Sequence, residues 1–224
     1  YPYVHGSAWM AAGYNFVSAS RAAVLERRIE MNRYNTADII CGKQLTTQIG
    51  RPGASAPRYE VFPAALREQI ADFTRVGGNI LVSGAYVGSD IWEPVFEYEA
   101  DPANVESSKN FAQEVLHYRW MTNNAAVSGI VKGVQNPLGV DRDGRYIFNT
   151  IPGDKIYCVE SPDGLNPVGE GAWTIFRFAE NNISAGIAYS GPYKTVVLGF
   201  PVETLDSPEQ VDCLIGEVAR FFDR

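Results

Sequence analysis

The sequence predicts an α/β protein of three layers, in which helices cover both faces of a mostly parallel sheet. Two short apolar runs, Ala37–Cys41 and Ile80–Val82, flank a helix pattern that begins after Pro63. This strand–helix–strand order is typical of the βαβ unit, whose two strands lie parallel in one sheet. After Trp120 the pattern changes to short strands separated by turns, which predicts an antiparallel, β-rich extension over residues 121–206. We expect the whole chain of 224 residues to form one α/β domain.

The first part of the chain carries clear helix caps and strand signals. Gly13 is typical of a helix end, and Ser20 is a typical N-cap. Pro63 suits the first turn of a helix, and apolar residues recur at helical spacing after it. The expected elements, in order, are a helix over 7–12, a strand over 14–17, a helix from Arg21 to about Met31, a strand over 37–41, an exposed loop from Leu45 to Tyr59, a helix from Pro63 to about Val76, and a strand over 80–82.

Turn clusters divide the second part of the chain. Ser207-Pro208-Glu209-Gln210 is a capping box with proline at the first helical position, and an apolar stripe at helical spacing follows. A doubly wound sheet usually begins on a strand, whereas this chain begins on a helix, so we expect a first strand upstream of Tyr1. The expected elements are a helix from Ser107 or Ser108 to about Trp120, strands over 127–134, 146–149, 156–159, 173–178, 183–189 and 194–200, and a final helix after Ser207.

Composition and charge argue against several classes of function. A net charge of −7 and a pI of about 4.9 argue against nucleic-acid binding, which requires a basic face. No apolar run approaches the roughly 20 residues of a membrane span. Cys41, Cys158 and Cys213 lie too far apart for a metal cluster or a disulfide framework, and we expect small buried thiols. The sequence also lacks the glycine-rich loops that bind nucleotides, so we expect no cofactor and no metal.

The stretch Gly77–Asp90 contains the most informative motif. Its strand ends at Gly84-Ala85-Tyr86-Val87-Gly88, which has the spacing of a nucleophile elbow. The last predicted strand runs on to Phe200-Pro201-Val202-Glu203. Together these motifs resemble those of the class I glutamine amidotransferase-like superfamily, in which the elbow holds a cysteine and the later strand ends in His-Pro-Glu. The resemblance covers about residues 35–90 and 183–222, and it implies a flavodoxin-like fold.

Two positions depart from the pattern of that superfamily. Tyr86 stands where the family has its cysteine, and Phe200 stands where it has its histidine. Acyl transfer of this type needs a thiolate and a neighbouring base, and neither a phenol with a pKa near 10 nor a phenyl ring supplies these groups. Of the two histidines, His5 lies near the start, and His117 lies in a predicted helix, where we expect a structural role. We therefore do not expect amidotransferase chemistry.

Longer stretches resemble a second group of proteins. Glu160–Asp163, Ala172–Ser184, Ser184–Tyr189 and Thr195–Glu203 are similar to a region shared by large secreted proteins of anaerobic gut bacteria, which are often labelled xanthan lyase. This resemblance implies a module of a longer polypeptide in the cell envelope or outside the cell. It also implies carbohydrate, or other domains of the same polypeptide, as partners. It leaves the oligomeric state open.

The candidate site lies where the predicted parallel strands end, because ligands of such sheets bind at the carboxyl ends of the strands. We expect these residues to form a crevice beside the elbow. The candidates for a catalytic role are Tyr86, Ser83, Asp90 and Glu203, and those for ligand binding are Lys43, Gln44, Tyr86 and Ser89.

Two hypotheses for the function follow. The first is a non-catalytic scaffold or ligand-binding module of a secreted multidomain bacterial protein linked to polysaccharide utilisation, because the nucleophile and base positions are both replaced. The alternative is a hydrolase or polysaccharide lyase in which Tyr86 works with the other candidates in a rearranged site. That alternative requires these side chains to converge within hydrogen-bonding reach of one another or of a shared cleft.

Overall fold

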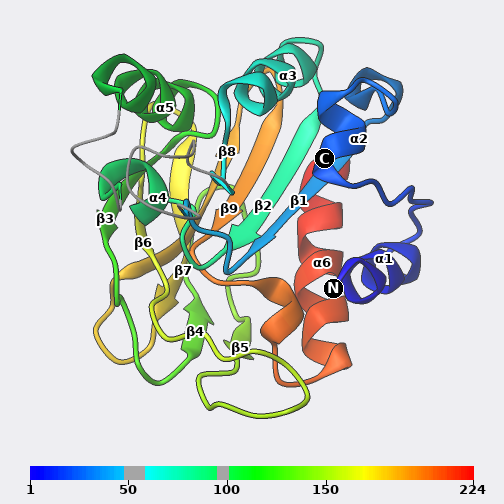
Figure 1. Cartoon of the computed structure of the whole chain (residues 1–224). Coiled ribbons are helices and arrows are strands. Elements are labelled where there is room, and N and C mark those ends of the chain that lie inside the picture. Colours follow the sequence, from blue (N-terminus) through cyan, green and yellow to red (C-terminus); the bar gives the residue numbers. More distant parts are fainter. Residues whose placement is uncertain (48–58, 95–100) are drawn as a thin grey trace.

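A curled, mixed sheet of seven strands forms the centre of the computed structural model, which describes residues 1–47, 59–94 and 101–224 (Figure 1). Beside it lies a small antiparallel sheet of two strands. The large sheet contains, in spatial order, β1 (Thr36–Gly42), β2 (Asn79–Gly84), β9 (Lys194–Leu198), β8 (Ser184–Ser190), β7 (Ala172–Phe178), β4 (Ile130–Gly133) and β5 (Arg145–Ile147), and the small sheet pairs β3 (Tyr118–Thr122) with β6 (Gly164–Pro167).

The α/β class is confirmed, but the sheet is mixed rather than mostly parallel. In the described ranges, only the pairs β1–β2 and β2–β9 are parallel, with Leu81 of β2 between Asp38 of β1 and Val196 of β9. From β9 onward, each pair in the order β9, β8, β7, β4 and β5 is antiparallel. The β-rich part of the chain therefore extends the parallel part of the same sheet, because β8 pairs directly with β9.

Helices cover both faces of the sheet and bury two sets of apolar side chains. One set includes Leu81 and Leu198 and packs under the first and last helices of the chain, where Trp9 stacks on Phe222. The other set includes Ile80 and Val82. The helices are α1 (Pro2–Ala11) and α6 (Pro208–Asp223) on the first face, α3 (Ala64–Arg75) and α5 (Pro102–Glu114) on the second, and the short α2 (Arg21–Leu25) and α4 (Ser89–Trp92), with 3₁₀ turns at Met31–Arg33 and Val202–Thr204 (Figure 1).

The best-predicted helices follow their sequence signals closely. Ser207 caps α6 by accepting a hydrogen bond from the backbone N–H of Gln210 at 3.4 Å. The predicted apolar stripe of α6 is buried, as is that of α3. Ser20 also caps a helix as predicted, but α2 ends at Leu25 rather than near Met31.

Several predicted elements are wrong in kind or in extent. Residues 14–17 and 156–159 form no strand. The helix expected up to Trp120 begins earlier, at Pro102, with Asp101 as its N-cap, and ends at Glu114. Trp120 instead lies in β3, whose partner strand β6 was not predicted. Most of the long loop expected from Leu45 to Tyr59 falls at positions 48–58, outside the described residues.

Within the described part of the chain, no helix is long and apolar enough to cross a membrane.

Candidate functional site

The carboxyl ends of the three parallel strands meet at one edge of the sheet, as the sequence predicts. After β2, the backbone N–H of Ala85 donates to the carbonyl of Gly42 at 2.8 Å, which joins the ends of β1 and β2. Glu203 follows β9 in a 3₁₀ turn and is 5% exposed. Gly42 has a positive φ of 55°, a conformation that glycine adopts readily.

A segment from Tyr157 to Asp163 covers this edge, and we call it the covering segment. Its first residue, Tyr157, donates its hydroxyl to Oε1 of Glu203 at 2.8 Å. In its middle, Glu160 pairs with Lys43. Its last residue, Asp163, accepts hydrogen bonds through Oδ2 from the backbone N–H groups of Gly88 and Ser89, at 2.6 and 2.9 Å. The turn after β2 is therefore held by a packed segment of the same chain.

Asp163 is the best-connected residue of the covering segment. Its side chain is fully buried, and besides the backbone of the turn it accepts a hydrogen bond from Nε1 of Trp120 at 3.2 Å. Burial raises the pKa of this carboxyl to about 7, against the opposing effect of the hydrogen bonds from Ser89 and Gly88. Gly199, just after β9, allows the backbone of Asp163 to approach closely, because a Cβ there would overlap the carbonyl oxygen of Asp163.

Tyr86 and Phe200, the two residues that depart from the amidotransferase-like motifs, lie in different surroundings. The ring of Tyr86 is half-buried; burial raises the pKa of its hydroxyl, and the neighbouring charge of Lys43 opposes this rise. Phe200 is fully buried and stacks on Phe148, with 5.5 Å between the ring centroids. Phe200 is therefore part of the apolar core and offers no proton acceptor to Tyr86.

The other predicted site residues have structural partners of their own. Both carboxylate oxygens of Asp90 accept backbone hydrogen bonds, from Thr46 at 2.7 Å and from Val61 at 2.8 Å. Gln44 donates to the carbonyl of Glu60 at 2.6 Å. Ser89 contacts Asp163 through its backbone N–H and, at 3.4 Å, its hydroxyl.

Ser83 is fully buried, and its hydroxyl has no hydrogen-bond partner among the described residues. Across the ranges that the structure covers, no side-chain hydrogen bond joins Tyr86 to Ser83, Asp90 or Glu203; Tyr86 and Asp90 are joined only through the backbone, where the N–H of Asp90 donates to the carbonyl of Tyr86 at 3.2 Å. The strand ends thus bring these four candidates to one edge of the sheet without linking them into a proton-transfer chain.

The two histidines have different environments. His117 is not in a helix: it has a positive φ of 61°, its ring stacks on Tyr189 at 3.4 Å between centroids, and its Nε2 lies 3.1 Å from the hydroxyl of Tyr193. His5 lies on α1 and is 2% exposed. His117 therefore has the structural role that the sequence suggests, whereas His5 belongs to a buried polar cluster that the sequence analysis did not identify.

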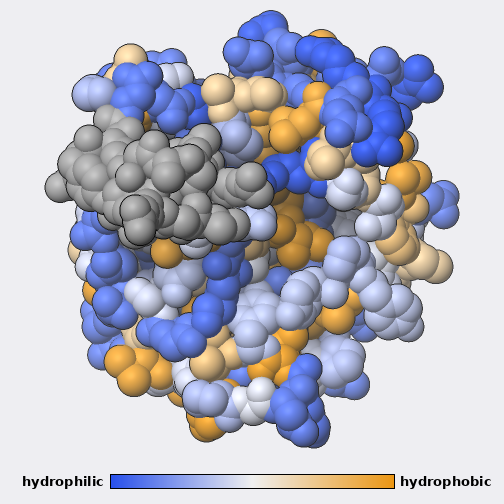
Figure 2. Space-filling view, viewed as in Figure 1, coloured by the Kyte–Doolittle hydropathy of each residue, from blue (hydrophilic) through white to orange (hydrophobic). Residues whose placement is uncertain are grey.

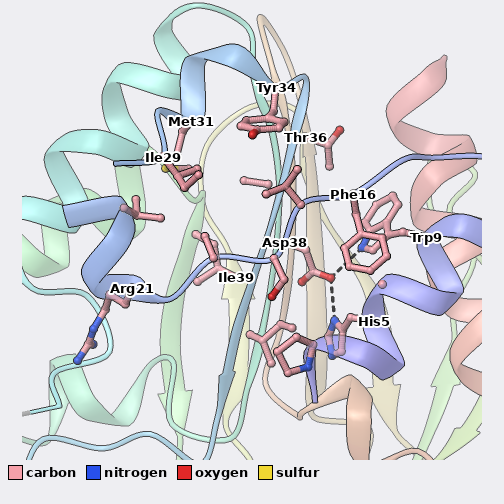
Figure 3. Close-up of a pocket in the computed structure, with 18 of the residues that line it drawn as sticks. His5, Trp9, Phe16, Arg21, Ile29, Met31, Tyr34, Thr36, Asp38 and Ile39 are labelled. Atoms are coloured by element: carbon pink, nitrogen blue, oxygen red, sulfur yellow. Dashed lines mark hydrogen bonds and ion pairs between the residues drawn. The ribbon is translucent and has the colours of Figure 1, made fainter. Parts of the chain in front are cut away.

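We call this group the His5 cluster, and it consists of His5, Trp9, Asp38 and Glu203. Nδ1 of His5 lies 2.7 Å from Oδ2 of Asp38, and its Nε2 lies 3.3 Å from Oε2 of Glu203. Trp9 donates from Nε1 to the same oxygen of Asp38 at 2.8 Å (Figure 3). The cluster joins three elements, because His5 and Trp9 come from α1, Asp38 from β1 and Glu203 from the turn after β9.

The two carboxylates determine the charge of His5. Burial alone would lower the pKa of the imidazole, but Asp38 and Glu203 raise it to about 10. The two acidic side chains therefore favour the imidazolium form of the ring near neutral pH. Oδ1 of Asp38 is buried and has no hydrogen-bond partner in the described ranges.

A cavity of about 440 Å³ lies beside this cluster, along the outer edge of β1 (Figure 3). We call it the edge cavity. Six consecutive residues of β1, Thr36 to Cys41, line it, so it follows the strand rather than one face of the sheet. The chain between α1 and α2 borders its outer side, and apolar side chains appear on the surface there, where Phe16 and Val17 are exposed (Figure 2).

One signal in the sequence points to this second site. Asp38 is the only charged residue in the apolar run Ala37–Cys41, and a lone carboxylate in such a strand needs a partner. The partners themselves have no local signal, because His5 and Glu203 are 33 and 165 residues away along the chain.

We expect Gly199→Ala to destabilise the protein by about 2 kcal/mol or more, because the new methyl group overlaps the backbone of Asp163. The matched control is Gly153→Ala, since nothing lies within 4 Å of a Cβ at that exposed position. Urea unfolding of both variants provides the measurement. Equal stability of the two would contradict the close approach described here.

We expect His5 to make the free energy of unfolding depend on pH. Its folded pKa of about 10 lies above the ordinary value of 6.5, so its contribution is fully present below about pH 6.5 and is lost as the pH rises through 10. Between about pH 6.5 and pH 9 the wild type should lose about 3 kcal/mol that His5→Gln does not lose. His117→Gln is the control. Burial lowers the pKa of His117 below 6.5, so the contribution of His117 to the free energy of unfolding changes below about pH 6.5 and not between about pH 6.5 and pH 9.

No family model matches the sequence, and a comparison with curated proteins finds no match. Among solved structures, the chain is similar to one described as the mmIFT52 N-terminal domain, with a TM-score of 0.50 and 14% sequence identity. The alignment covers 94% of this chain and 86% of that chain. At this level of identity the similarity shows the fold alone, and it supports an α/β arrangement with a mixed sheet.

Proposed function

We propose that this protein is a non-catalytic ligand-binding module whose ligand site is the edge cavity. The proposal rests on a difference between the strand ends around Tyr86 and the outer edge of β1. The strand ends around Tyr86 are held by the covering segment, whereas the edge of β1 borders a cavity of about 440 Å³. A volume in this range is typical of sites for small ligands.

The state of the elbow supports the non-catalytic part of the proposal. Phe200 occupies the position of the base and is packed in the core against Phe148. The turn around Tyr86 is tied through Gly88 and Ser89 to Asp163. A nucleophile needs a base within reach, and Phe200, which stands at the position of the base, cannot accept a proton.

The composition of the edge cavity supports the binding part. Its walls are largely apolar and aromatic, with Trp9, Phe16 and Met31 among them, and its polar groups are few. Asp38 contributes a carboxylate held in place by His5 and Trp9. Mostly apolar walls with a small number of oriented polar groups are the usual makeup of a binding site.

A finer part of the proposal concerns descent. We infer that the chain derives from the flavodoxin-like, class I glutamine amidotransferase-like fold, supported by the elbow spacing at Gly84–Gly88, by the parallel strands β1, β2 and β9, and by the fold similarity. The expected link to an exported multidomain protein and to polysaccharide utilisation stays a prediction that rests on sequence resemblance.

The alternative function is a hydrolase or polysaccharide lyase with Tyr86 at its centre. One observation favours it: the charge of Lys43 lies near the Tyr86 hydroxyl and opposes the effect of burial on its pKa. This reading requires Lys43 to leave Glu160 and the covering segment to make room for a substrate.

We expect no turnover above background when the purified protein is screened against ester, amide and glycan substrates. Tyr86→Phe, which removes only the phenolic oxygen, should give the same result as the wild type. A substrate that is turned over, with kcat/KM falling about 100-fold or more in Tyr86→Phe and the fold intact by circular dichroism, would overturn the non-catalytic proposal and favour the alternative.

We expect a library of small fragments, including oligosaccharides, to shift NMR signals of β1 and α1 and to leave those of Gly84–Ser89 unchanged. Tyr86→Phe should bind the same fragments, because Tyr86 is not among the residues that line the edge cavity. Shifts confined to the turn after β2 would contradict the choice of site. Absence of any fragment binding would count against a small-ligand site.

A further inference from the structure

The outer edge of β1 presents backbone groups that no neighbouring strand uses. In the described ranges, β1 is the first strand of the sheet and pairs only with β2. The carbonyl of Asn35 accepts from Asn79, so it points toward β2. Because backbone groups alternate in direction along a strand, those of Thr36, Asp38 and Ile40 point outward, toward the edge cavity.

The chain that borders the cavity leaves these groups free. In the described part of the chain, no backbone hydrogen bond joins residues 14–20 to β1. Residues 15–20 are exposed and have no regular secondary structure. Open strand edges readily pair with another extended chain, which is why most proteins cover or disrupt them.

The two faces beside this edge differ in chemistry (Figure 3). On the side of α1, Asp38 points toward His5 and Trp9, and the carboxylates of the His5 cluster outnumber its cation. On the other side, Ile39 faces Ile29 and Met31 (Figure 3). An extended chain added to β1 would place alternate side chains against an acidic, aromatic wall and an apolar wall.

Two cations line the edge cavity among the described residues: His5, which is bound to Asp38 and Glu203, and Arg21, which lies away from this acidic group. The guanidinium of Arg21 donates to the carbonyl of Glu60 at 2.5 Å, and in Figure 3 its side chain points away from Asp38. Arg21 therefore disfavours a basic ligand group at the α2 end of the cavity. At the α1 end, Asp38 can still attract such a group.

We propose that the edge cavity binds an extended peptide segment of a partner protein, which adds a strand to β1 and alternates basic with apolar residues. Backbone hydrogen bonds to Thr36, Asp38 and Ile40 supply affinity, and the two walls select the side chains. Lysine or arginine faces Asp38, while valine, isoleucine or leucine faces Ile39. This inference rests on the proposed binding function and names its ligand class.

A second copy of this chain fits the edge less well. Two β1 edges paired about a two-fold axis would bring two Asp38 carboxylates to the same interface, where like charges repel. Each copy would also bring the chain between α1 and α2, which borders the cavity, into the contact. A single extended segment avoids the repulsion between two Asp38 carboxylates and brings no second copy of this chain into the contact.

The test uses synthetic peptides with the core Lys-Val-Lys-Val-Lys-Val. Two reference peptides have Glu in place of Lys, or the same residues in two blocks of three. The alternating basic peptide should bind about tenfold more tightly, or better, than either reference in a fluorescence anisotropy titration. Equal binding of all three would overturn the proposal.

A pair of N-methylated peptides tests the strand addition itself. One peptide is methylated on the three lysine amides and the other on the three valine amides, so that each loses the donors of one edge of its strand. Only one edge faces β1, so one peptide should lose binding about tenfold or more and the other should keep it. Equal loss in both, or loss in neither, would exclude pairing along β1.

Protein variants test whether Asp38 causes the preference for basic peptides. Asp38→Asn keeps an acceptor for His5 and Trp9 and should reduce the preference for Lys over Glu by about fivefold. Asp72→Asn, an exposed acid on α3, is the matched control and should leave the preference unchanged. An unchanged preference in Asp38→Asn would overturn the assignment of the acidic wall.

The outcomes also separate this inference from the proposed function. Fragment binding at β1 without peptide binding would overturn the peptide ligand and leave the binding module intact. A stable dimer in sedimentation velocity, with β1 protected from hydrogen exchange in the dimer, would identify a second copy as the occupant and overturn the inference. Failure of fragments and peptides together would count against the proposed function as well.

Discussion

The buried ion group of His5, Asp38 and Glu203 is the interaction on which the parallel end of the sheet depends. Placing two carboxylates side by side in a largely buried site is costly without a cation between them, because each carries a desolvation cost that nothing offsets. His5 supplies that cation and contacts both carboxylates through its two ring nitrogens. One side chain thus fixes the first helix, an edge strand and the turn after the last strand relative to one another.

The covering segment imposes a second constraint, at the place where a nucleophile elbow would expose its reactive group. Asp163 binds the backbone amides of Gly88 and Ser89 and so fixes the turn after β2. Phe200 is buried in the core and offers no proton acceptor. The turn after β2 is therefore held in place by a distant part of the same chain.

The sequence was informative where local signals determine the structure. Helices α3 and α6 and strands β1 and β2 were predicted because their caps and apolar periodicity act over a few residues. Residues 14–17 have the composition of a strand but find no partner among the described residues, and β-structure requires one. At Tyr118–Thr122 a strand forms where the sequence predicted none. Its partner is the Gly-Leu-Asn-Pro stretch of β6, which has little strand propensity. For the candidate site, the sequence predicted only that the strand ends meet at one edge of the sheet. It did not predict the His5 cluster, because Asp38 and Glu203 are 165 residues apart and leave no local pattern.

The contacts of Asp90 affect how well this protein tolerates insertions. Its two oxygens hold the backbone at Thr46 and at Val61, so a single carboxylate fixes both stems of the intervening stretch. Closing a longer stretch between fixed stems costs little additional entropy, roughly 0.6 kcal/mol for each doubling of length. Insertions between these stems should therefore leave the sheet undisturbed, which makes this position a natural point for grafting foreign sequence onto the scaffold.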